Sequence, residues 1–310
     1  MPILRDTFLA MSTNSFVRRF VIAFPLSRLV SRRFVAGETL DEAIQVVKQL
    51  NAQNMQVTFD QLGESVSKES EAREAKDGYL RALDAIAANQ VSSHVSVKLT
   101  QMGLDLSPDL CLDNMRQIIA RAKAIGTFVR IDMEDSARTQ ATLNIFKTLR
   151  EEFDNVGIVI QSYLYRSEAD VQALLALGAN VRLCKGAYKE PAEIAFPRKA
   201  DVDENYKKLA AIFLGANGAS NGAHLALATH DEKMIAWAKE YIAAHSVDNR
   251  RFEFQMLYGI RNDLQRKLAS EGYTMRVYVP YGTHWYPYFM RRLAERPANV
   301  IFLVTNLFKS

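Results

Sequence analysis

The sequence predicts an α/β protein that folds as a (β/α)8 barrel, with additional N-terminal helices and one further helix after the eighth strand. Eight short runs of apolar or β-branched residues alternate with long helical patterns beyond residue 38, and such alternation requires parallel strands joined by crossover helices. Eight units in about 250 residues is the number that closes a barrel. Polar residues also stand at the ends of seven of the eight units. A doubly wound open sheet is the alternative that the alternation also allows.

Each predicted strand or helix has its own signal in the sequence. The strands are short apolar runs rich in β-branched and aromatic residues, at 55–59, 95–98, 128–132, 157–161, 180–183, 225–228, 252–254 and 275–279. The helices carry apolar residues every three or four positions, at 38–53, 68–89, 108–124, 136–150, 167–177, 201–215, 231–244, 259–271 and 285–295. In the first helix the apolar positions are Leu40, Ala43, Ile44, Val47 and Leu50.

Helix ends are predicted from capping residues and glycines. Ser107 before Pro108 is expected to cap one helix, and Asp201 or Asp203 another. The glycine-rich stretch at 215–222 has the wrong spacing for a phosphate-binding loop and is predicted to be a mobile connection.

The composition is that of a soluble globular protein. The 310 residues are 48% apolar and 24% charged, which excludes a disordered chain, a collagen-like fibre and a disulfide mini-domain. A net charge of +4 does not indicate nucleic-acid binding. Cys111 and Cys184 are the two cysteines, so no disulfide framework or cysteine-built zinc site is expected, and a reducing, cytosol-like compartment fits best. No apolar run reaches the ~18 residues of a membrane-spanning helix.

A basic segment opens the chain, and we predict residues 1–38 to be a basic helical arm and residues 39–310 to be the barrel domain. Between Thr7 and Gly37 there is no acidic residue, while five arginines stand at positions 18, 19, 28, 32 and 33. Phenylalanines at 16, 20 and 24 have nearly helical spacing. Two interpretations stay open: an ordinary surface helix, or a transit-peptide-like or membrane-surface helix.

The polar residues at the strand ends are the first functional signal. They are Asp60, Lys98, Asp132, Gln161, Lys185, Thr229 with His230, and Tyr278. In a parallel barrel all these ends open on one face, and that face carries the chemistry. The nucleotide-binding, zinc-protease and serine-hydrolase motifs are not found, and the five histidines lack metal-ligand spacing. We therefore expect no metal.

Two constellations fit the binding of an anion. In the tail helix, Tyr288, Arg291 and Arg292 are spaced to share a face, and paired guanidiniums form a forked donor set for a small carboxylate. After the fifth strand, Arg182 and Lys185 flank the strand end, with Gly186 permitting close backbone approach. The alternatives are a solvated basic helix end and a tight β-to-α turn.

Six motifs in order resemble the proline dehydrogenase (proline oxidase) family, in its compact monofunctional bacterial form. They are Val97-Lys98-Leu99, Arg130-Ile-Asp132-Met-Glu134, Arg182-Leu-Cys-Lys-Gly-Ala-Tyr188, Ala228-Thr-His230, Phe254-Gln255-x-Leu257 and Tyr288-x-x-Arg291-Arg292. The resemblance implies a (β/α)8 barrel that binds FAD noncovalently and oxidises L-proline to Δ1-pyrroline-5-carboxylate, with hydride transfer from proline C5 to flavin N5. It also implies a membrane quinone as electron acceptor and a downstream pyrroline-5-carboxylate (glutamate semialdehyde) dehydrogenase. The expected location is the cytoplasm, with or without peripheral attachment to the inner face of the membrane.

The resemblance also implies roles for individual residues. Arg291 and Arg292, together with Lys98, would bind the substrate carboxylate, and Tyr278, Tyr288, Leu257 and Tyr188 would enclose the pyrrolidine ring. Asp132 and Arg182 would be the catalytic residues, Arg182 lying near flavin N5. Glu64 would be a gate that pairs with the first tail arginine. The flavin-binding positions would be Met133, Gln161, Arg182, Lys185, Gly186, Ala187, Thr229, His230 and Gln255.

Trp285 and Tyr286 depart from the pattern of the bifunctional relatives, which carry smaller or acidic residues there, so the resemblance does not extend to the outer FAD environment. Two rival functions use the same residues. A Schiff-base aldolase would use Lys98 or Lys185 as its nucleophile. A non-catalytic anion-binding module would use the tail arginines alone.

Overall fold

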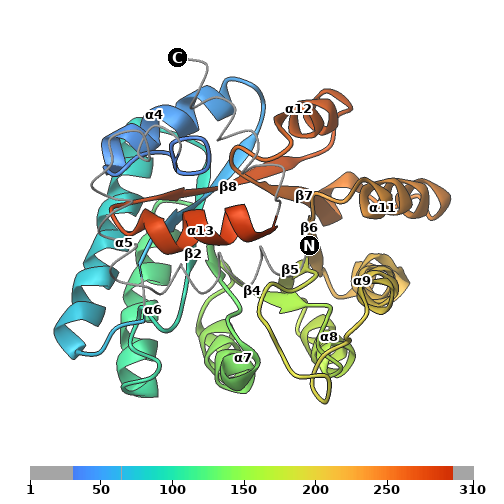
Figure 1. The fold of residues 1–310 in the computed structure, drawn as a ribbon, viewed down its shortest axis with the longest axis horizontal. Coiled ribbons are helices and arrows are strands. Elements are labelled where there is room, and N and C mark those ends of the chain that lie inside the picture. Colours follow the sequence, from blue (N-terminus) through green and yellow to red (C-terminus); the bar gives the residue numbers. More distant parts are fainter. Residues whose placement is uncertain (1–30, 64, 296–310) are drawn as a thin grey trace.

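A computed structural model describes residues 31–63 and 65–295, and its eight parallel strands form a closed barrel in the order β1 to β8 (Figure 1). The strands are β1 Gln56–Gln61, β2 Ser93–Val97, β3 Val129–Ile131, β4 Val156–Gln161, β5 Asn180–Cys184, β6 His224–Ala228, β7 Phe252–Leu257 and β8 Met275–Tyr281. Pairing of β1 with β8, from Gln56 opposite Arg276 to Gln61 opposite Tyr281, closes the ring. The predicted barrel is confirmed and the open-sheet alternative is wrong.

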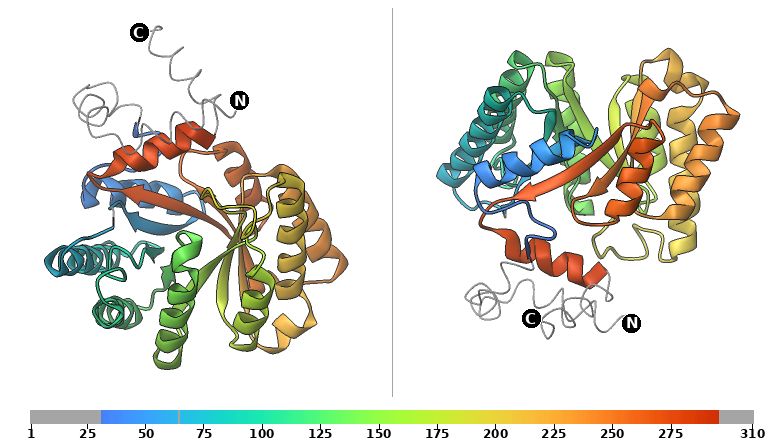
Figure 2. Two further views of the ribbon diagram at one scale, coloured as in Figure 1. Left: turned by 60° about the horizontal axis from the view of Figure 1, so that its bottom comes forward. Right: turned by 90° about the horizontal axis from the view of Figure 1, so that it is seen from above.

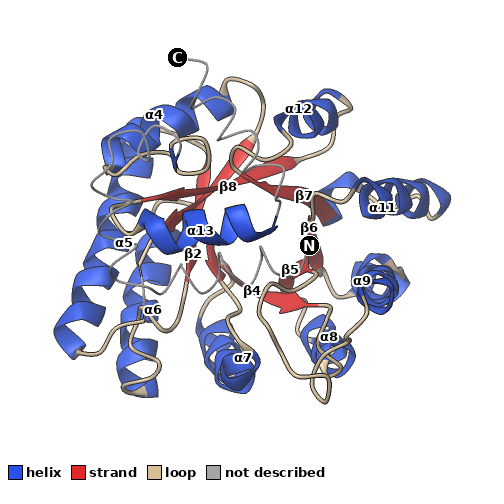
Figure 3. Cartoon of the chain, in the orientation of Figure 1, coloured by secondary structure: helices blue, strands red, loops and turns tan. Residues whose placement is uncertain are grey.

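Helices α5 to α12 surround the barrel and connect consecutive strands, α4 precedes β1 and α13 follows β8 (Figure 3). They are α4 Leu40–Asn51, α5 Glu69–Asn89, α6 Pro108–Ala124, α7 Ser136–Glu152, α8 Ser167–Ala176, α9 Lys199–Leu214, α10 Ala216–Ser220, α11 Glu232–Ala244, α12 Asn262–Ser270 and α13 Trp285–Glu295. Each predicted strand and helix corresponds to an observed one, with ends that differ by a few residues. In α4 the apolar stripe is buried, and Thr39 and Glu42 form a capping box.

Two local predictions were wrong and one was confirmed. The Ser107 side chain accepts a hydrogen bond from the Leu110 amide and caps α6 as expected. Helix α9 begins at Lys199 after Arg198, without a side-chain cap, because Asp201 pairs with Arg198 and Asp203 binds lysines instead. The connection predicted to be a mobile loop at 215–222 contains the short helix α10.

The strands place apolar side chains toward the helices and polar ones inside the barrel. On β1, Val57 and Phe59 belong to the apolar core, whereas the hydroxyl of Thr58 lies 3.1 Å from that of Ser96 on β2. Successive side chains of a strand point to opposite faces. The residues that face the interior of the barrel therefore alternate with the apolar residues that face the helices. Much of the barrel interior is therefore polar, whereas β4 and β6 place the apolar residues Val159 and Ala226 beside Arg182.

Helix α13 lies across the carboxyl-terminal opening of the barrel (Figures 1 and 2). A separate apolar cluster holds it there, in which Phe34 and Val35 from the start of the described chain pack with its residues Trp285, Phe289 and others. The backbone of this early segment also bonds to the end of β8, from the Ala36 amide to the Pro280 carbonyl at 2.8 Å. The last residues of the predicted basic arm, 31–38, thus pack on the barrel, whereas residues 1–30 lie outside the described residues. Within the described part of the chain, no helix has the length and apolar character needed to cross a membrane.

Candidate active site

The carboxyl ends of four strands bring a lysine, two aspartates and a tyrosine together at the barrel mouth. Lys98 Nζ donates to Asp60 Oδ1 at 2.8 Å and lies 3.8 Å from Asp132 Oδ2. The Tyr278 hydroxyl donates to Asp132 Oδ2 at 2.9 Å and lies 3.4 Å from Lys98 Nζ. Asp60 and Asp132 are buried, so each needs a compensating cation or donor. This arrangement fixes the position and the charge of Lys98.

Arg182 crosses the barrel beneath this group and is held on three sides. Its Nη1 donates to Asp132 Oδ1 at 2.7 Å, its Nη2 donates to Ser96 Oγ at 2.9 Å, and its Nε donates to Gln255 Oε1. The guanidinium carbon also lies 5.2 Å from the centre of the Tyr278 ring, a cation–π distance. Five sequence-predicted residues, Lys98, Asp132, Arg182, Gln255 and Tyr278, therefore form one network.

The electrostatics of the network determine its protonation. Burial would lower the pKa of Lys98, but Asp60 and Asp132 outweigh burial and hold that pKa above its ordinary value. Burial, reinforced by the charges of Asp132 and Asp60, raises the pKa of Tyr278 well above its ordinary value. At neutral pH the mouth therefore carries a permanent ammonium and a protonated phenol.

Helix α13 supplies the upper part of the site. Tyr288 is buried, and Arg292 is 8% exposed with its guanidinium carbon 5.0 Å from the centre of the Tyr288 ring. Arg291 is exposed. The helix therefore presents one arginine packed on a tyrosine and, beside it, one in solvent.

Tyr188 connects the two parts of the site electrostatically. It follows β5, is 40% exposed, and has a pKa raised to about 12, mainly by burial and by the charge of Glu134, while Lys98 and Arg291 oppose the shift. A charge in the barrel and a charge on α13 both act on this one hydroxyl. Helix α13 and the strand ends that carry Lys98 and Tyr278 lie at the same end of the barrel (Figures 1 and 2).

The predicted cofactor residues line a second sector of the mouth, from β4 to β7. Lys185 is bound by Asp203 and Asp231, and the Asp231 amide donates to Thr229 Oγ1 at 3.1 Å. The Leu257 amide donates to His230 Nε2 at 2.9 Å, which makes Nε2 an acceptor and assigns the ring proton to Nδ1.

Two other predicted cofactor residues, Gln161 and Met133, are buried at the edge of this sector. Gln161 Nε2 donates to the Glu134 carbonyl at 2.8 Å. Gly186 has a φ of +117°, and a Cβ there would lie 2.3 Å from Tyr163 Cδ1, so only glycine fits. The positive φ fits the tight β-to-α turn that the sequence also allowed, and the exposed Gly186-Ala187 backbone offers a surface with almost no side chain.

Several polar residues inside the barrel were not predicted as site residues. They share one position, two residues before a residue of the mouth: Thr58 before Asp60, Ser96 before Lys98, Arg130 before Asp132, Asn180 before Arg182, Glu253 before Gln255 and Arg276 before Tyr278. Polar residues at a spacing of two inside predicted buried strands are the signal that would have found them. Asp60 stood at a predicted strand end but had no partner assigned to it. Glu64, the predicted gate, lies outside the described residues.

Trp285 and Tyr286 anchor α13. Both are buried in the cluster with Phe34 and Val35, and Trp285 Nε1 donates to Glu38 Oε1 at 2.9 Å. Their departure from the bifunctional pattern therefore falls on the packing beneath the helix.

Replacing Trp285 by phenylalanine is expected to loosen α13. The variant loses a buried hydrogen bond to a carboxylate, which costs about 1–3 kcal/mol, and the Michaelis constant should rise more than kcat falls because the arginines of α13 are less well positioned. Thermal unfolding and steady-state kinetics measure both effects. Trp237→Phe, at the other tryptophan, half-buried on α11, is the matched control. Equal effects of both variants on the Michaelis constant would contradict the anchoring role.

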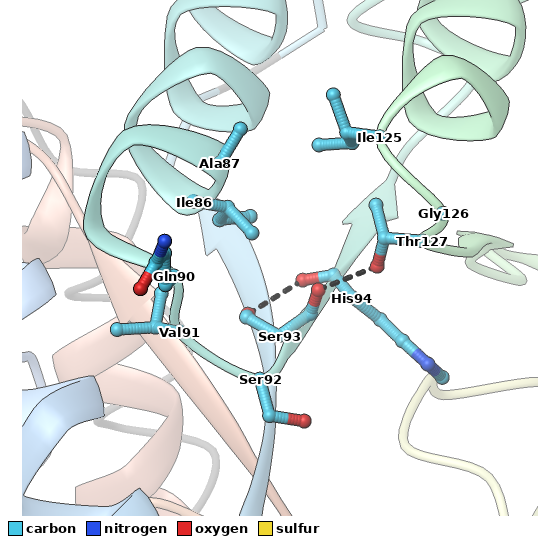
Figure 4. A pocket seen from close by; sticks show the side chains of 10 residues that line it. All are labelled: Ile86, Ala87, Gln90, Val91, Ser92, Ser93, His94, Ile125, Gly126 and Thr127. Carbon is cyan, nitrogen blue, oxygen red and sulfur yellow. Dashed lines mark hydrogen bonds between the residues drawn. The ribbon is translucent and has the colours of Figure 1, made fainter.

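A separate hollow of about 470 Å³ lies at the opposite end of the barrel (Figure 4). It is lined by residues at the end of α5, the start of β2 and the turn before β3, including Ile86, His94 and Thr127. The amino ends of the strands in such barrels serve stability rather than chemistry. Among the described residues no cluster of histidine, cysteine, aspartate or glutamate is arranged to hold a metal ion, and both cysteines are free.

Comparison with known proteins agrees with this geometry. Residues 43–305 match the family model described as proline dehydrogenase. The chain is 45% identical to proline dehydrogenase 1 of Bacillus subtilis (strain 168) over 306 residues, which is 99% of each chain. It is also 45% identical to the proline dehydrogenase of Deinococcus radiodurans, over 90% of each chain.

Solved structures give the same result for the fold. The crystal structure of proline utilization A (PutA) from Bdellovibrio bacteriovorus, inactivated by N-propargylglycine, superposes with a TM-score of 0.81 at 26% identity. The match covers 95% of this chain and 36% of that one. The chain is thus similar in length to the monofunctional relatives and to one part of the longer PutA protein.

Proposed function

The chain belongs to the proline dehydrogenase family, and from this membership we propose that it oxidises L-proline to Δ1-pyrroline-5-carboxylate with noncovalently bound FAD. The observation that supports the proposal most strongly is the network of Lys98, Asp132, Arg182 and Tyr278 beneath the arginines of α13. When bound, FAD would supply the electron acceptor, with flavin N5 as the atom to which the hydride of proline C5 is transferred. The chain itself supplies binding, orientation and charge.

The proposed substrate site lies between Lys98 and α13. Lys98, Arg291 and Arg292 bind the carboxylate, because three cations around one small anion fix both its position and its orientation. Tyr278, Tyr288, Leu257 and Tyr188 enclose the saturated ring. Lys98 is suited to this role because its two aspartates keep it charged.

Asp132 and Arg182 are the proposed catalytic residues. Proline must lose a proton from its amine as well as the hydride from C5, and Asp132 is the carboxylate next to Lys98 that can influence this proton. Arg182 places a positive charge where the electrons arrive and is itself held by Asp132 at 2.7 Å. Such fixed charges act strongly in a site from which water is excluded.

The proposed FAD site uses the β4–β7 sector of the mouth. The residues present fit the group: amide, hydroxyl and ammonium donors at the ends of neighbouring strands, together with the Gly186-Ala187 backbone, where a side chain would meet Tyr163. Gln161, Lys185, Thr229, His230 and Gln255 provide the polar contacts. Met133 provides an apolar one, and Glu64 stays a predicted gate that pairs with Arg291.

Anaerobic titration tests the proposal directly. Purified protein is expected to be yellow, and L-proline is expected to bleach the flavin absorption in the absence of oxygen, with hydroxyproline doing so less because its extra hydroxyl must fit the same ring pocket. Visible spectroscopy measures both reactions. A colourless protein that stays inert after reconstitution with FAD would contradict the proposed function.

The same preparation separates the rival functions. An aldolase needs a neutral lysine as nucleophile. Asp60 and Asp132 outweigh the effect of burial and raise the pKa of Lys98, so this lysine is charged at neutral pH. Borohydride trapping of a carbonyl substrate would favour the aldolase. Anion binding without bound flavin or turnover would favour the binding module.

Electron delivery to a membrane quinone completes the proposed reaction. The two electrons taken from proline would go on to the quinone, and the product would go on to a pyrroline-5-carboxylate dehydrogenase. We propose a cytoplasmic location with contact to the inner membrane face, for which the arginines of the first 33 residues are the candidate contact.

A further inference from the structure

A buried ion pair lies inside the barrel, one layer below the candidate active site. Arg276 on β8 donates to Glu253 on β7 through Nε at 2.8 Å and through Nη2 at 3.0 Å. Its Nη1 donates to the Val57 carbonyl at 2.9 Å. Glu253 is 4% exposed and Arg276 is 5% exposed. A buried pair of this kind is often no more stabilising than two apolar residues, so stability alone does not explain its presence.

Gln255 connects this pair to Arg182. Both Glu253 and Gln255 are inner residues of β7, two positions apart, so their side chains lie one above the other. Gln255 Nε2 donates to Glu253 Oε1, and Gln255 Oε1 accepts from Arg182 Nε. A carboxylate only accepts hydrogen bonds and a guanidinium only donates them, so the two partners together dictate which way the amide faces.

The connection has a consequence for Arg182. If Glu253 did not hold the amide nitrogen, Gln255 could turn and present a donor to Arg182, which cannot accept. Asp132 and Ser96 hold the two other nitrogens of Arg182. Gln255 is therefore the third fixed contact, and its orientation depends on a residue that does not touch Arg182.

The charge of Glu253 is secure. Burial would raise the pKa of Glu253, but Arg276, aided by His224 and His94, outweighs burial and holds that pKa below its ordinary value. The carboxylate therefore remains ionised, and an acceptor, at neutral pH.

We propose that Glu253, fixed by Arg276, is a positioning residue for the reaction: it orients Gln255, which in turn holds Arg182 in place for electron transfer to the cofactor. The inference rests on the proposed flavin-dependent function. Glu253 acts through two other side chains, so its loss should alter the electron-accepting property of the site more than the binding of proline.

The primary test is the double variant Glu253→Leu/Arg276→Met, studied as the flavin-loaded protein. It removes the pair without leaving a buried charge, so folding should be retained, and the net charge is unchanged. We expect the equilibrium constant for two-electron reduction to fall about tenfold, which corresponds to about 30 mV in midpoint potential. We expect kcat to fall by a similar factor and the Michaelis constant for proline to change less than twofold. Spectroelectrochemical titration and steady-state kinetics measure these quantities.

Two further variants separate positioning from general destabilisation. Leu268→Ala, buried on α12, should lower the unfolding temperature and leave the potential unchanged. Gln255→Leu removes the contact with Arg182, leaves the ion pair in place and serves if the double variant does not fold. No charge is lost in this variant, so loss of the Arg182 position should appear as a lower potential.

The outcomes are distinct from those that test the proposed function. Wild-type protein that proline does not bleach would contradict the proposed function itself. Wild-type protein that is bleached, with a double variant of unchanged potential and kcat, would overturn the role of Glu253 alone. If Gln255→Leu is the variant that folds, an unchanged or raised potential would overturn that role as well.

Discussion

Replacing Arg292 by methionine should raise the Michaelis constant for proline about 10- to 150-fold. The expected loss is that of a charge-assisted, bidentate contact with the substrate carboxylate, about 1.5–3 kcal/mol. Methionine retains much of the stem that packs near Tyr288, so the variant removes the charge with little change in volume. Arg291→Met should act in the same direction. Steady-state kinetics with L-proline measure both.

The matched control for both arginines is Arg266→Met, on the exposed face of α12 outside the site. It makes the same chemical change and should leave the kinetics unchanged. FAD content and unfolding temperature should be followed in all three variants, so that a folding defect is not mistaken for a lost contact. If Arg291→Met and Arg292→Met both retained the wild-type Michaelis constant, the carboxylate site would be elsewhere.

Replacing Asp132 by asparagine should lower kcat/KM by about two to three orders of magnitude. Asp132 accepts from Arg182 and Tyr278 and lies 3.8 Å from Lys98 Nζ, and removing one partner of a buried charge pair costs roughly 2–5 kcal/mol. Asparagine has the same shape but no charge, so Arg182 loses the carboxylate that pairs with it, and Lys98 keeps Asp60. Both kcat and the Michaelis constant should change, because one substitution disturbs the catalytic and the substrate-binding cations together.

Asp201→Asn is the control for this variant. Asp201 pairs with Arg198 at 2.7 Å at the start of α9 and lies outside the network. An exposed pair of this kind contributes little, so its kinetics should match the wild type. A kcat/KM for Asp132→Asn within threefold of the wild-type value would remove Asp132 from the catalytic residues.

The fold was predictable from the sequence because parallel barrels repeat a simple pattern. Each strand was visible as an apolar run, since its outer face packs on helices, and each helix was visible from its spacing. The ends were less predictable: β7 extends to Leu257, beyond the predicted 252–254, because Gln255 and Leu257 belong to the strand although the apolar run ends earlier. Helix α10 lies in a glycine-rich stretch that ordinarily forms loops.

The candidate site was predictable to the extent that its residues stand at strand ends or in family motifs. The sequence does not indicate which side chains inside the barrel contact each other across it. Arg182 and Ser96, 86 residues apart, meet only because β5 and β2 face each other. Likewise, the carboxylates that hold Lys98 come from β1 and from the residue after β3, and their choice depends on closure of the ring.

Phe34 and Val35, which precede the first barrel helix, pack under α13, which follows the last strand. A shortened version that began at residue 39 would retain every strand, every barrel helix and every side chain assigned to substrate or flavin. It would nevertheless lose the residues that support α13 and its two arginines. One of these is Glu38, whose carboxylate accepts a hydrogen bond from the indole of Trp285. For protein engineering, the minimal catalytic unit therefore begins before the first barrel helix.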